Sequence, residues 1–297
     1  MDNLEILSKD NIEKAIGGLN IQGDIVLVKP NWVSAFKGGF TDAKTIELLL
    51  QTIKKKVIFI ESYTFWRTDK KLETKEDYFS SREATFETGK VHHEFFRKMD
   101  KWFLDYTGIG EVLKQYGAEY LCITDELWNG KETDFSKIQN IVEETYNPVL
   151  EKDLYSYIPK KLFDLRGSDL ISFAKIKLDS SYGASLSIKN LFGLIPDPNR
   201  YVKYHGENET HLIKNIVDIN KIYKSLFKVH YVNESLFENC FMNWDTEESE
   251  PRIGNGYILA GNNGAEVDAT TLKDLGANFE NALSGLTDLY SKEIGNK

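Results

Sequence analysis

Four lysines lie directly after apolar segments of the kind that form buried strands, or inside a motif that follows one. They are Lys29, Lys175, Lys177 and Lys189. The chain is acidic as a whole, with 46 Asp and Glu against 37 Lys and Arg and a formal net charge of −9. Lysines gathered at strand ends in such a chain could form a local anion site, whose natural ligand is a carboxylate or a phosphate. The alternative for each lysine alone is ordinary exposure at a strand end.

Two asparagines accompany these lysines as candidate substrate-binding residues, and Asn190 could orient a ligand through its amide. Asn31 follows Lys29 after Pro30, which stiffens the backbone where the strand ends. Asn190 directly follows Lys189 in the segment 187–193. If the strand before Lys175 continues, a period of two places Lys175 and Lys177 on the same face.

Asp268 is the acid that we expect in the same site. The segment 260–268 leads from an apolar run through a Gly/Asn turn into a helix, whose N-terminus suits anions but matches no nucleotide-binding fingerprint. Its spacing from Thr271 and Leu275 places Asp268 on the inward face. A buried acid needs a partner, so Asp268 would hold a lysine charged or bind a divalent cation such as magnesium. A purely structural ion pair is the alternative.

These patterns predict one cleft at the carboxyl ends of the strands. The residues that we expect to converge there are Lys29, Asn31, Lys175, Lys189, Asn190 and Asp268, with Lys177 beside them. Lys189 and Asp268 are the catalytic candidates, because burial and pairing can bring the pKa values of Lys and carboxylate side chains towards the working pH. The other residues would bind the substrate.

Composition excludes several functional classes. The acidic balance argues against a nucleic-acid binder. Two cysteines are too few for a disulfide scaffold, a four-cysteine zinc site or a self-contained iron–sulfur cluster, and the five histidines have no metal-binding spacing. The first residues lack signal-peptide features and no apolar run reaches about 18 residues. We therefore expect a cytoplasmic protein that binds neither nucleic acid nor membrane, and a homodimer stays open.

The elements that must position these residues alternate along the first half. Continuous apolar runs at 25–28, 57–60 and 120–123 predict buried strands, and helical spacing predicts amphipathic helices at 43–53 and 109–116. Ser8 and Asp42 are candidate helix caps. This alternation is typical of an α/β fold with a mainly parallel central sheet.

The second half is less regular and predicts antiparallel additions. Strands are expected at 170–174 and 184–188, antiparallel to each other, and at 229–232 and 257–260. Helices are expected from Thr210, over 265–275 and over 279–290. We expect a single α/β domain over 1–297. Residues 62–106 lack periodicity and would be an insertion or lid over the sheet edge, or a solvated helical excursion.

The ordered motifs resemble the domain-of-unknown-function family 362 from about residue 24 to 276. They are Lys29-Pro30-Asn31, Lys175-x-Lys177, the segment 188–196, His205, Asp218 and the run from Ile258 to Ala269. The resemblance adds His205 as a substrate-binding candidate. It also implies a fold similar to the N-terminal part of the nickel-pincer lactate racemase, which is a statement about fold rather than function.

The chain departs from the family pattern at several points, one of them at Asn233-Glu234-Ser235, where members have an Asp-Gly-rich segment. Many members read Lys-Thr-His where this chain has Lys177-Leu178-Asp179, and many carry a ferredoxin-like cluster domain that this chain lacks. The function that we expect is an enzyme acting on a small anionic metabolite, by isomerisation or another proton transfer. A metabolite-binding or accessory protein without turnover is the alternative, and a redox partner is the least favoured class. No cofactor is specified beyond the divalent cation.

Overall fold

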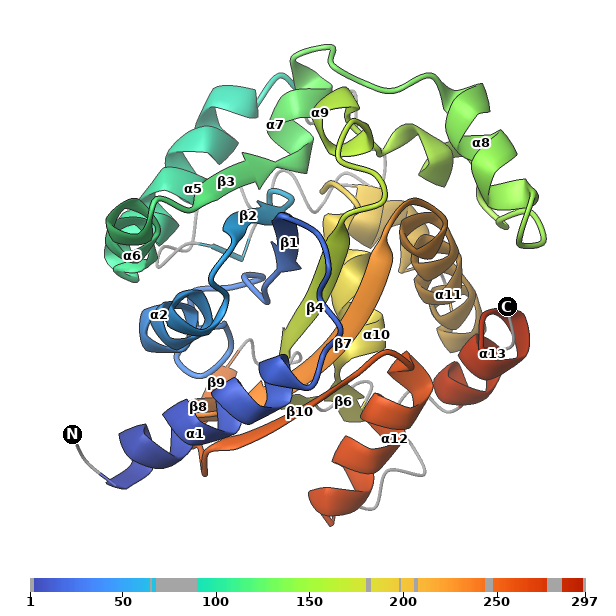
Figure 1. Cartoon of the computed structure of the whole chain (residues 1–297). Coiled ribbons are helices and arrows are strands. Elements are labelled where there is room, and N and C mark those ends of the chain that lie inside the picture. Colours follow the sequence, from blue (N-terminus) through green and yellow to red (C-terminus); the bar gives the residue numbers. More distant parts are fainter. Residues whose placement is uncertain are drawn as a thin grey trace.

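Apolar strands form a six-stranded central sheet. The strands are β1 (Ile25–Lys29), β2 (Lys56–Glu61), β3 (Glu119–Cys122), β4 (Asp169–Lys175), β7 (Lys228–Ser235) and β10 (Tyr257–Gly261). Their order is β10-β7-β4-β1-β2-β3, and all neighbours are parallel except β10 and β7 (Figure 1). The computed structural model describes residues 3–64, 66–67, 90–179, 183–197, 199–205, 208–243, 248–276 and 285–295. The predicted α/β fold with a mainly parallel sheet is confirmed.

Helices cover both faces of this sheet because successive strand residues point to opposite sides. Val26 and Val28 pack in one apolar cluster and Leu27 in the other. The first cluster includes residues of α1 (Asn3–Gly17), α2 (Ala43–Thr52), α5 (His93–Tyr106) and α6 (Ile109–Tyr116). The second includes residues of α8 (Phe135–Glu143), α11 (Glu209–Leu226), α12 (Gly264–Asp274) and α13 (Leu286–Glu293).

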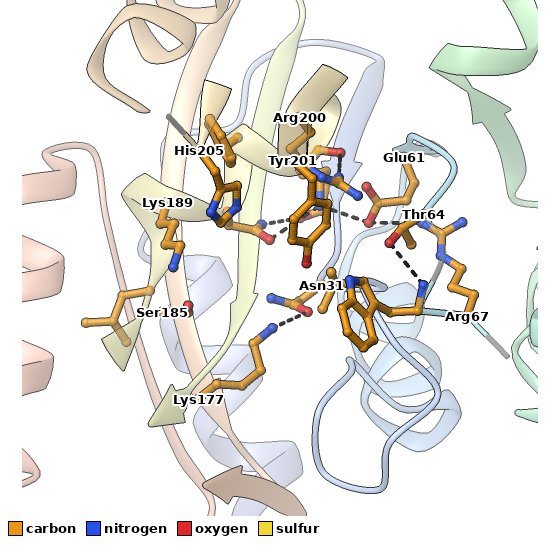
Figure 2. Close-up of a pocket in the computed structure, with 17 residues that line it drawn as sticks. Asn31, Glu61, Thr64, Arg67, Lys177, Ser185, Lys189, Arg200, Tyr201 and His205 are labelled. Atoms are coloured by element: carbon orange, nitrogen blue, oxygen red, sulfur yellow. Dashed lines mark hydrogen bonds and ion pairs between the residues drawn. The ribbon is translucent and has the colours of Figure 1, made fainter. Parts of the chain in front are cut away.

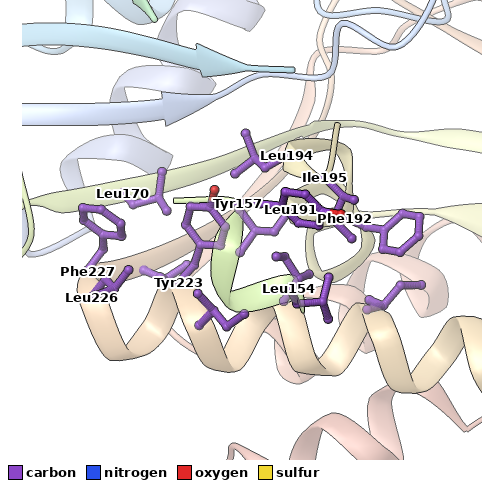
Figure 3. Close-up of a cluster of buried hydrophobic side chains, with 14 of the residues drawn as sticks. Leu154, Tyr157, Leu170, Leu191, Phe192, Leu194, Ile195, Tyr223, Leu226 and Phe227 are labelled. Atoms are coloured by element: carbon purple, nitrogen blue, oxygen red, sulfur yellow. The ribbon is translucent and has the colours of Figure 1, made fainter. Parts of the chain in front are cut away.

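The second cluster anchors the segment that carries the candidate motif. Figure 3 shows Leu191, Phe192, Leu194 and Ile195 among buried side chains that include Tyr223 of α11. These residues belong to or follow η2 (Leu191–Leu194), a 3-10 turn directly after α10 (Ser187–Asn190). The apolar half of the motif is therefore core, and this packing holds Lys189 and Asn190 in place.

The strand order of the central sheet reverses at β1, because later strands are added first on one side of β1 and then on the other. β2 and β3 lie on one side of β1, whereas β4 and β7 lie on the other. In open α/β sheets such a reversal leaves a crevice outside the carboxyl ends of the strands. Lys29 ends β1 and Glu61 ends β2 at that edge.

A smaller, mixed sheet corrects the expectation for the second half. It contains β5 (Lys177–Asp179), β6 (Gly183–Ser185), β8 (Glu238–Asn243) and β9 (Glu248–Ile253), in the order β6-β5-β8-β9. The prediction of a strand over 184–188 paired with 170–174 is wrong. The strand ends at Ser185 and pairs with β5, and the chain turns into α10 from Ser187. Nothing in the sequence analysis predicted β8 or β9.

Helix boundaries show which capping predictions hold. Asp42 caps α2 by accepting from the Thr45 N–H, as predicted. Ser8 lies inside α1 and not at its start, and Asn208 rather than Thr210 caps α11. Short helices not predicted are α7 (Ile123–Trp128), α9 (Lys160–Phe163), η1 (Lys152–Ser156) and the π-helical η3 (Arg200–Tyr204).

Two expectations fall partly outside the described residues. Within the expected insertion at 62–106, α5 is described, but 65 and 68–89 lie outside the described part. Of the closing helix expected over 279–290, α13 is described from Leu286. No helix in the described ranges is both long enough and apolar enough to cross a bilayer.

Candidate functional site

A cavity of about 340 Å³ lies at the carboxyl ends of β1 and β2. Figure 2 shows side chains entering it from both halves of the chain. The first half supplies Lys29, Asn31, Val33, Glu61, Thr64, Trp66 and Arg67. The second half supplies Lys177, Ser185, Leu186, Lys189, Asn190, Phe192, Gly193, Arg200, Tyr201 and His205. The position is the one that the strand reversal at β1 predicts.

Positive charge predominates in the lining. Five cationic side chains reach the cavity: Lys29, Arg67, Lys177, Lys189 and Arg200. Among the described lining residues, Glu61 supplies the one carboxylate. The excess is notable in a chain whose net charge is −9, because it creates a local field opposite to that of the whole molecule.

Lys29 and Glu61 form a buried ion pair at one end of the cavity. Lys29 Nζ lies 2.9 Å from Glu61 Oε2, and each side chain is 2 % exposed. The ammonium also donates to the main-chain oxygen of Pro30 at 2.6 Å. Burial lowers the pKa of Lys29 to about 8, although Glu61 opposes this shift. Lys29 is therefore much closer to losing its proton at neutral pH than an exposed lysine.

Arg67 lies beside this pair. Its Nη2 lies 3.6 Å from Glu61 Oε2 and donates to the Ser62 carbonyl at 2.7 Å. Its Nη1 pairs with Asp100 of α5, which is also buried. These contacts hold the guanidinium rigidly at the cavity wall.

Arg200 is held in place by groups that are close to it in the chain. Its Nη1 donates to the Gly193 carbonyl at 2.8 Å, and its Nη2 donates to Asp197 at 2.9 Å. Only 4 % of the residue is exposed. Arg200 is thus preorganised, which lowers the entropy cost of binding an anion.

Two lysines, Lys177 and Lys189, line the other end of the cavity. Lys177 Nζ donates to Asn31 Oδ1 at 3.1 Å, and the Asn31 N–H donates to Thr41 Oγ1 at 3.0 Å. Lys189 extends from α10 towards the same space (Figure 2). An anion placed between these ammonium groups would receive charge-assisted hydrogen bonds, which are stronger than neutral ones.

Aromatic rings form a side wall. Tyr201 stacks on His205 with ring centroids 4.8 Å apart and an interplanar angle of 7°. Phe192 meets the His205 ring edge-on at 5.4 Å. Burial, together with the charges of Lys189 and Arg200, lowers the pKa of His205 to about 3. His205 is therefore a neutral imidazole at neutral pH.

Asn190 has a different position from the one expected of a ligand-orienting amide. Its Nδ2 donates to the Lys29 carbonyl at 2.9 Å and to Ser172 Oγ at 3.2 Å. It is 6 % exposed. Asn190 reaches the cavity wall, but its amide fastens α10 to β1 and β4.

Most of the predicted site residues converge. Lys29, Asn31, Lys177, Lys189, Asn190 and His205 all line the cavity. Lys175 and Asp268 do not, so the predicted convergence is wrong for these two. Lys175 and Lys177 also do not share a strand face, because they lie in β4 and β5 of different sheets.

Lys175 belongs to an ion cluster in which it and Glu234 are fully buried. Its Nζ lies 2.8 Å from Glu234 and 3.2 Å from Asp42, and the lysine is 0 % exposed. Burial alone would lower the pKa of Lys175, but Glu234 and Asp42 hold it above its ordinary value. The lysine joins the β4 end to β7 and to the start of α2.

Asp268 is inward-facing, as predicted, and the described groups that contact its carboxylate are neutral hydrogen-bond donors rather than a lysine. Its carboxylate accepts from the N–H groups of Ser187 and Ile188 at 3.1 Å each and from Ser187 Oγ at 2.5 Å. Asn233 Nδ2 donates to it at 2.9 Å. Burial raises the pKa of Asp268 against the pull of these donors. Asp268 therefore fixes the start of α10, which carries Lys189.

Sequence reasoning missed Arg67 and Arg200. Both lie in segments without periodicity. Arg67 is held by Asp100 and Arg200 by the Gly193 carbonyl, and neither of these contacts follows from a sequence pattern. Arg200 follows closely after the recognised segment 188–196, and this proximity was the signal that could have identified it as a site residue.

A second cavity, of about 480 Å³, has no such charge excess. Its cations are Arg97, Lys101, Lys114 and Lys161, and its carboxylates are Asp100, Asp105, Glu111, Asp125 and Glu126. Several of these groups pair with one another, as Lys101 does with Asp105. The first cavity is therefore the better candidate site.

Comparison with models of known protein families identifies the family of this chain. The family model for a domain of unknown function, DUF362, matches residues 26–273. The chain belongs to this family. The matched range includes every described residue of this DUF362 chain that lines the first cavity. No curated protein and no solved structure matches the chain.

Metal binding by this DUF362 chain would require a cluster of ligating side chains. Within the described ranges, no group of three or more His, Cys, Asp or Glu side chains is placed to hold a metal ion. The divalent cation stays a prediction of the sequence.

Proposed function

We propose that the first cavity binds a small anionic metabolite, a carboxylate or a phosphate, and that the protein is an enzyme that transfers a proton on it. The observation that carries this proposal is the lining of five cationic side chains against one carboxylate, which is itself paired with Lys29. The volume lies at the small end of ligand sites, which favours a small metabolite.

Proton transfer is supported by the range of acid–base groups around one space. Lys189 is half-buried and reaches the cavity from α10, so it can hold the anion or exchange a proton with it. Lys29 has a pKa of about 8, which suits a group that gains and loses a proton near neutral pH. Enzymes of the isomerase type require such groups beside an acidic carbon.

The alternative is a binding or accessory protein that uses the same cations without turnover. Arg67 and Arg200 favour this alternative, because rigid guanidinium groups are suited to holding an anion and do not exchange protons. For either function the compartment that we propose is the cytoplasm. Two buried free thiols, Cys122 and Cys240, support a reducing compartment.

The binding test is calorimetric titration of inorganic phosphate into the protein and into Lys189→Met. The variant keeps the length and apolar stem of the lysine and removes its charge. We expect a loss of roughly tenfold or more in affinity. Lys98→Met, which removes an exposed charge on α5, is the matched control and should bind like the parent. Equal affinity of the parent and Lys189→Met would remove Lys189 from the site.

The turnover test is deuterium incorporation from D₂O into small hydroxy and oxo acids, followed by NMR. Incorporation that requires the protein and falls in Lys189→Met supports the enzyme. Binding of an acid without incorporation supports the accessory role.

A further inference from the structure

We propose that Lys29 is a catalytic residue that forms an imine with the carbonyl carbon of a small 2-oxo acid held in the first cavity. This inference rests on the proposed function, since it takes the cavity as an anion site. It adds the substrate class and the nucleophile.

The position of Lys29 is the first argument. The residue ends β1, a central strand, so its backbone is fixed by parallel neighbours on both sides. Its side chain is 2 % exposed yet lines the cavity. Imine-forming lysines require such a site, because a desolvated amine is a better nucleophile than an exposed ammonium.

Space beside the amine is kept open by Gly193. A Cβ at this position would lie 3.0 Å from Lys29 Nζ and 3.2 Å from Lys29 Cε. Because Gly193 has no side chain, no Cβ crowds the amine from the η2 side of the cavity. Any larger residue would cover the path by which a carbonyl carbon reaches the amine.

Glu61 is placed to move the protons that imine formation requires. Its Oε2 lies 2.9 Å from Lys29 Nζ, and its side chain lines the same cavity. Burial lowers the pKa of Lys29 to about 8. With that pKa, roughly one amine in ten is unprotonated near neutral pH, so the nucleophile is available without a large energetic cost.

The chemistry balances with these groups alone. The Lys29 ammonium gives one proton to Glu61, and the free amine attacks the carbonyl carbon, so that a C–N bond forms. The amine proton and the proton on Glu61 pass to the former carbonyl oxygen, which leaves as water when the C–O bond breaks. The product is a protonated imine, with Glu61 again a carboxylate and no redox change.

The cations explain why the carbonyl compound should be an acid. Arg67 and Arg200 flank the amine end, and Lys177 and Lys189 lie at the other end. A carboxylate adjacent to the carbonyl can therefore be bound while the carbonyl carbon faces Lys29. The resulting iminium withdraws electrons from the neighbouring carbon, which makes its C–H acidic and links imine formation to proton transfer.

The experiment is reductive trapping with pyruvate and sodium borohydride on the intact protein. Intact-mass and peptide mass spectrometry then locate the carboxyethyl group that reduction leaves on a lysine. We expect one such group, on Lys29, at higher occupancy than on the exposed Lys54 of the same sample. Lactate, which has no carbonyl, should compete for the cavity and lower this occupancy without forming an adduct. Glyoxylate, 2-oxobutyrate and oxaloacetate extend the panel.

Variants separate a reactive lysine from a structural one. Lys29→Met should abolish the adduct, and Glu61→Gln should slow its formation while leaving the Lys29 amine present. If oxo acids bind and are displaced by lactate but no adduct forms at Lys29, the imine is refuted and the proposed function stands. If neither oxo acid nor lactate nor phosphate binds, both fail. Labelling of Lys29 no greater than that of Lys54 also refutes the imine.

Discussion

Asn190 binds Lys29 at both ends of the lysine: its Nδ2 donates to the Lys29 carbonyl at 2.9 Å, and its Oδ1 accepts from Lys29 Nζ at 3.4 Å. The two residues are 161 positions apart in the sequence. One amide therefore sets both the distance between β1 and α10 and the direction of the amine. The residue that sequence analysis assigned to the ligand is used to orient a cavity side chain.

Replacing Asn190 with Ala should lower the free energy of unfolding by about 1–3 kcal/mol, because the Lys29 carbonyl and Ser172 Oγ lose buried partners. Chemical denaturation measures the change. Asn129→Ala is the matched control, since Asn129 makes bonds of similar length to Asp125 but is exposed, and it should change stability by less than about 0.5 kcal/mol. Equal losses in the two variants would show that burial is not the cause.

Gly193→Ala should cost about 1–3 kcal/mol, because the new methyl group overpacks the Lys29 ammonium. It should also lower the trapping of pyruvate on Lys29. Gly17→Ala is the control: a Cβ at Gly17, the last residue of α1, would meet no atom within 4 Å. That substitution should be neutral or stabilising by up to about 1 kcal/mol. A Gly193→Ala protein as stable and as readily trapped as the parent would contradict this account of the glycine.

Lys29 should make the protein more stable as the pH rises from about 8 towards 10.5. The folded pKa is about 8 and the ordinary value is 10.5. Between these limits the unfolded chain keeps the proton that the folded chain has lost, so raising the pH favours the folded state. Below pH 8 both states are protonated, and the contribution is constant.

The size of this effect is at most about 3.4 kcal/mol. Urea denaturation at several pH values, on the parent and on Lys29→Met/Glu61→Gln, isolates it. The double variant is used because Lys29→Met alone strands a buried carboxylate, which costs about 3–5 kcal/mol. As the pH rises through this window, the free energy of unfolding of the parent should increase relative to that of the double variant. Parallel pH profiles would disprove the assignment.

Asp268→Ala should lower the free energy of unfolding by at least about 2 kcal/mol, since its removal leaves buried donors of Ser187, Ile188 and Asn233 without their acceptor. Asp268→Asn keeps one acceptor oxygen and should lose less. Per folded molecule, phosphate affinity of Asp268→Asn should stay within about threefold of the parent, or under about 0.7 kcal/mol. A selective loss of deuterium exchange in a stable Asp268→Asn would instead restore the catalytic role that the sequence predicts.

The central strands could be predicted because their signal is local. β1, β2 and β4 are buried on both faces, so each is a continuous apolar run in the sequence. The strand ends then located Lys29, and the motif after β6 located Lys189. These predictions required no knowledge of what packs against each strand.

The remaining features depend on partners that are distant in the sequence. α10 begins at Ser187 because Asp268 accepts from its first N–H groups, so a segment read as a strand becomes a helix. Lys175 and Asp268 both have the inward position predicted for them, but their partners are structural groups. A buried charged residue needs a partner, but its residue type does not indicate whether that partner is a ligand or another part of the protein.

Finally, the cavity is assembled from 29–67 and 177–205, with helices α5 to α9 between the two segments. β1 pairs with β2 nearby in the chain, but its pairing with β4 closes a loop of well over a hundred residues, a contact of the kind that forms slowly. A nascent chain whose synthesis has not passed residue 205 has only part of the lining. Any ligand of this cavity would therefore bind only after β4 docks on β1, and by mass action it would favour completion of folding over the earlier, partly assembled states.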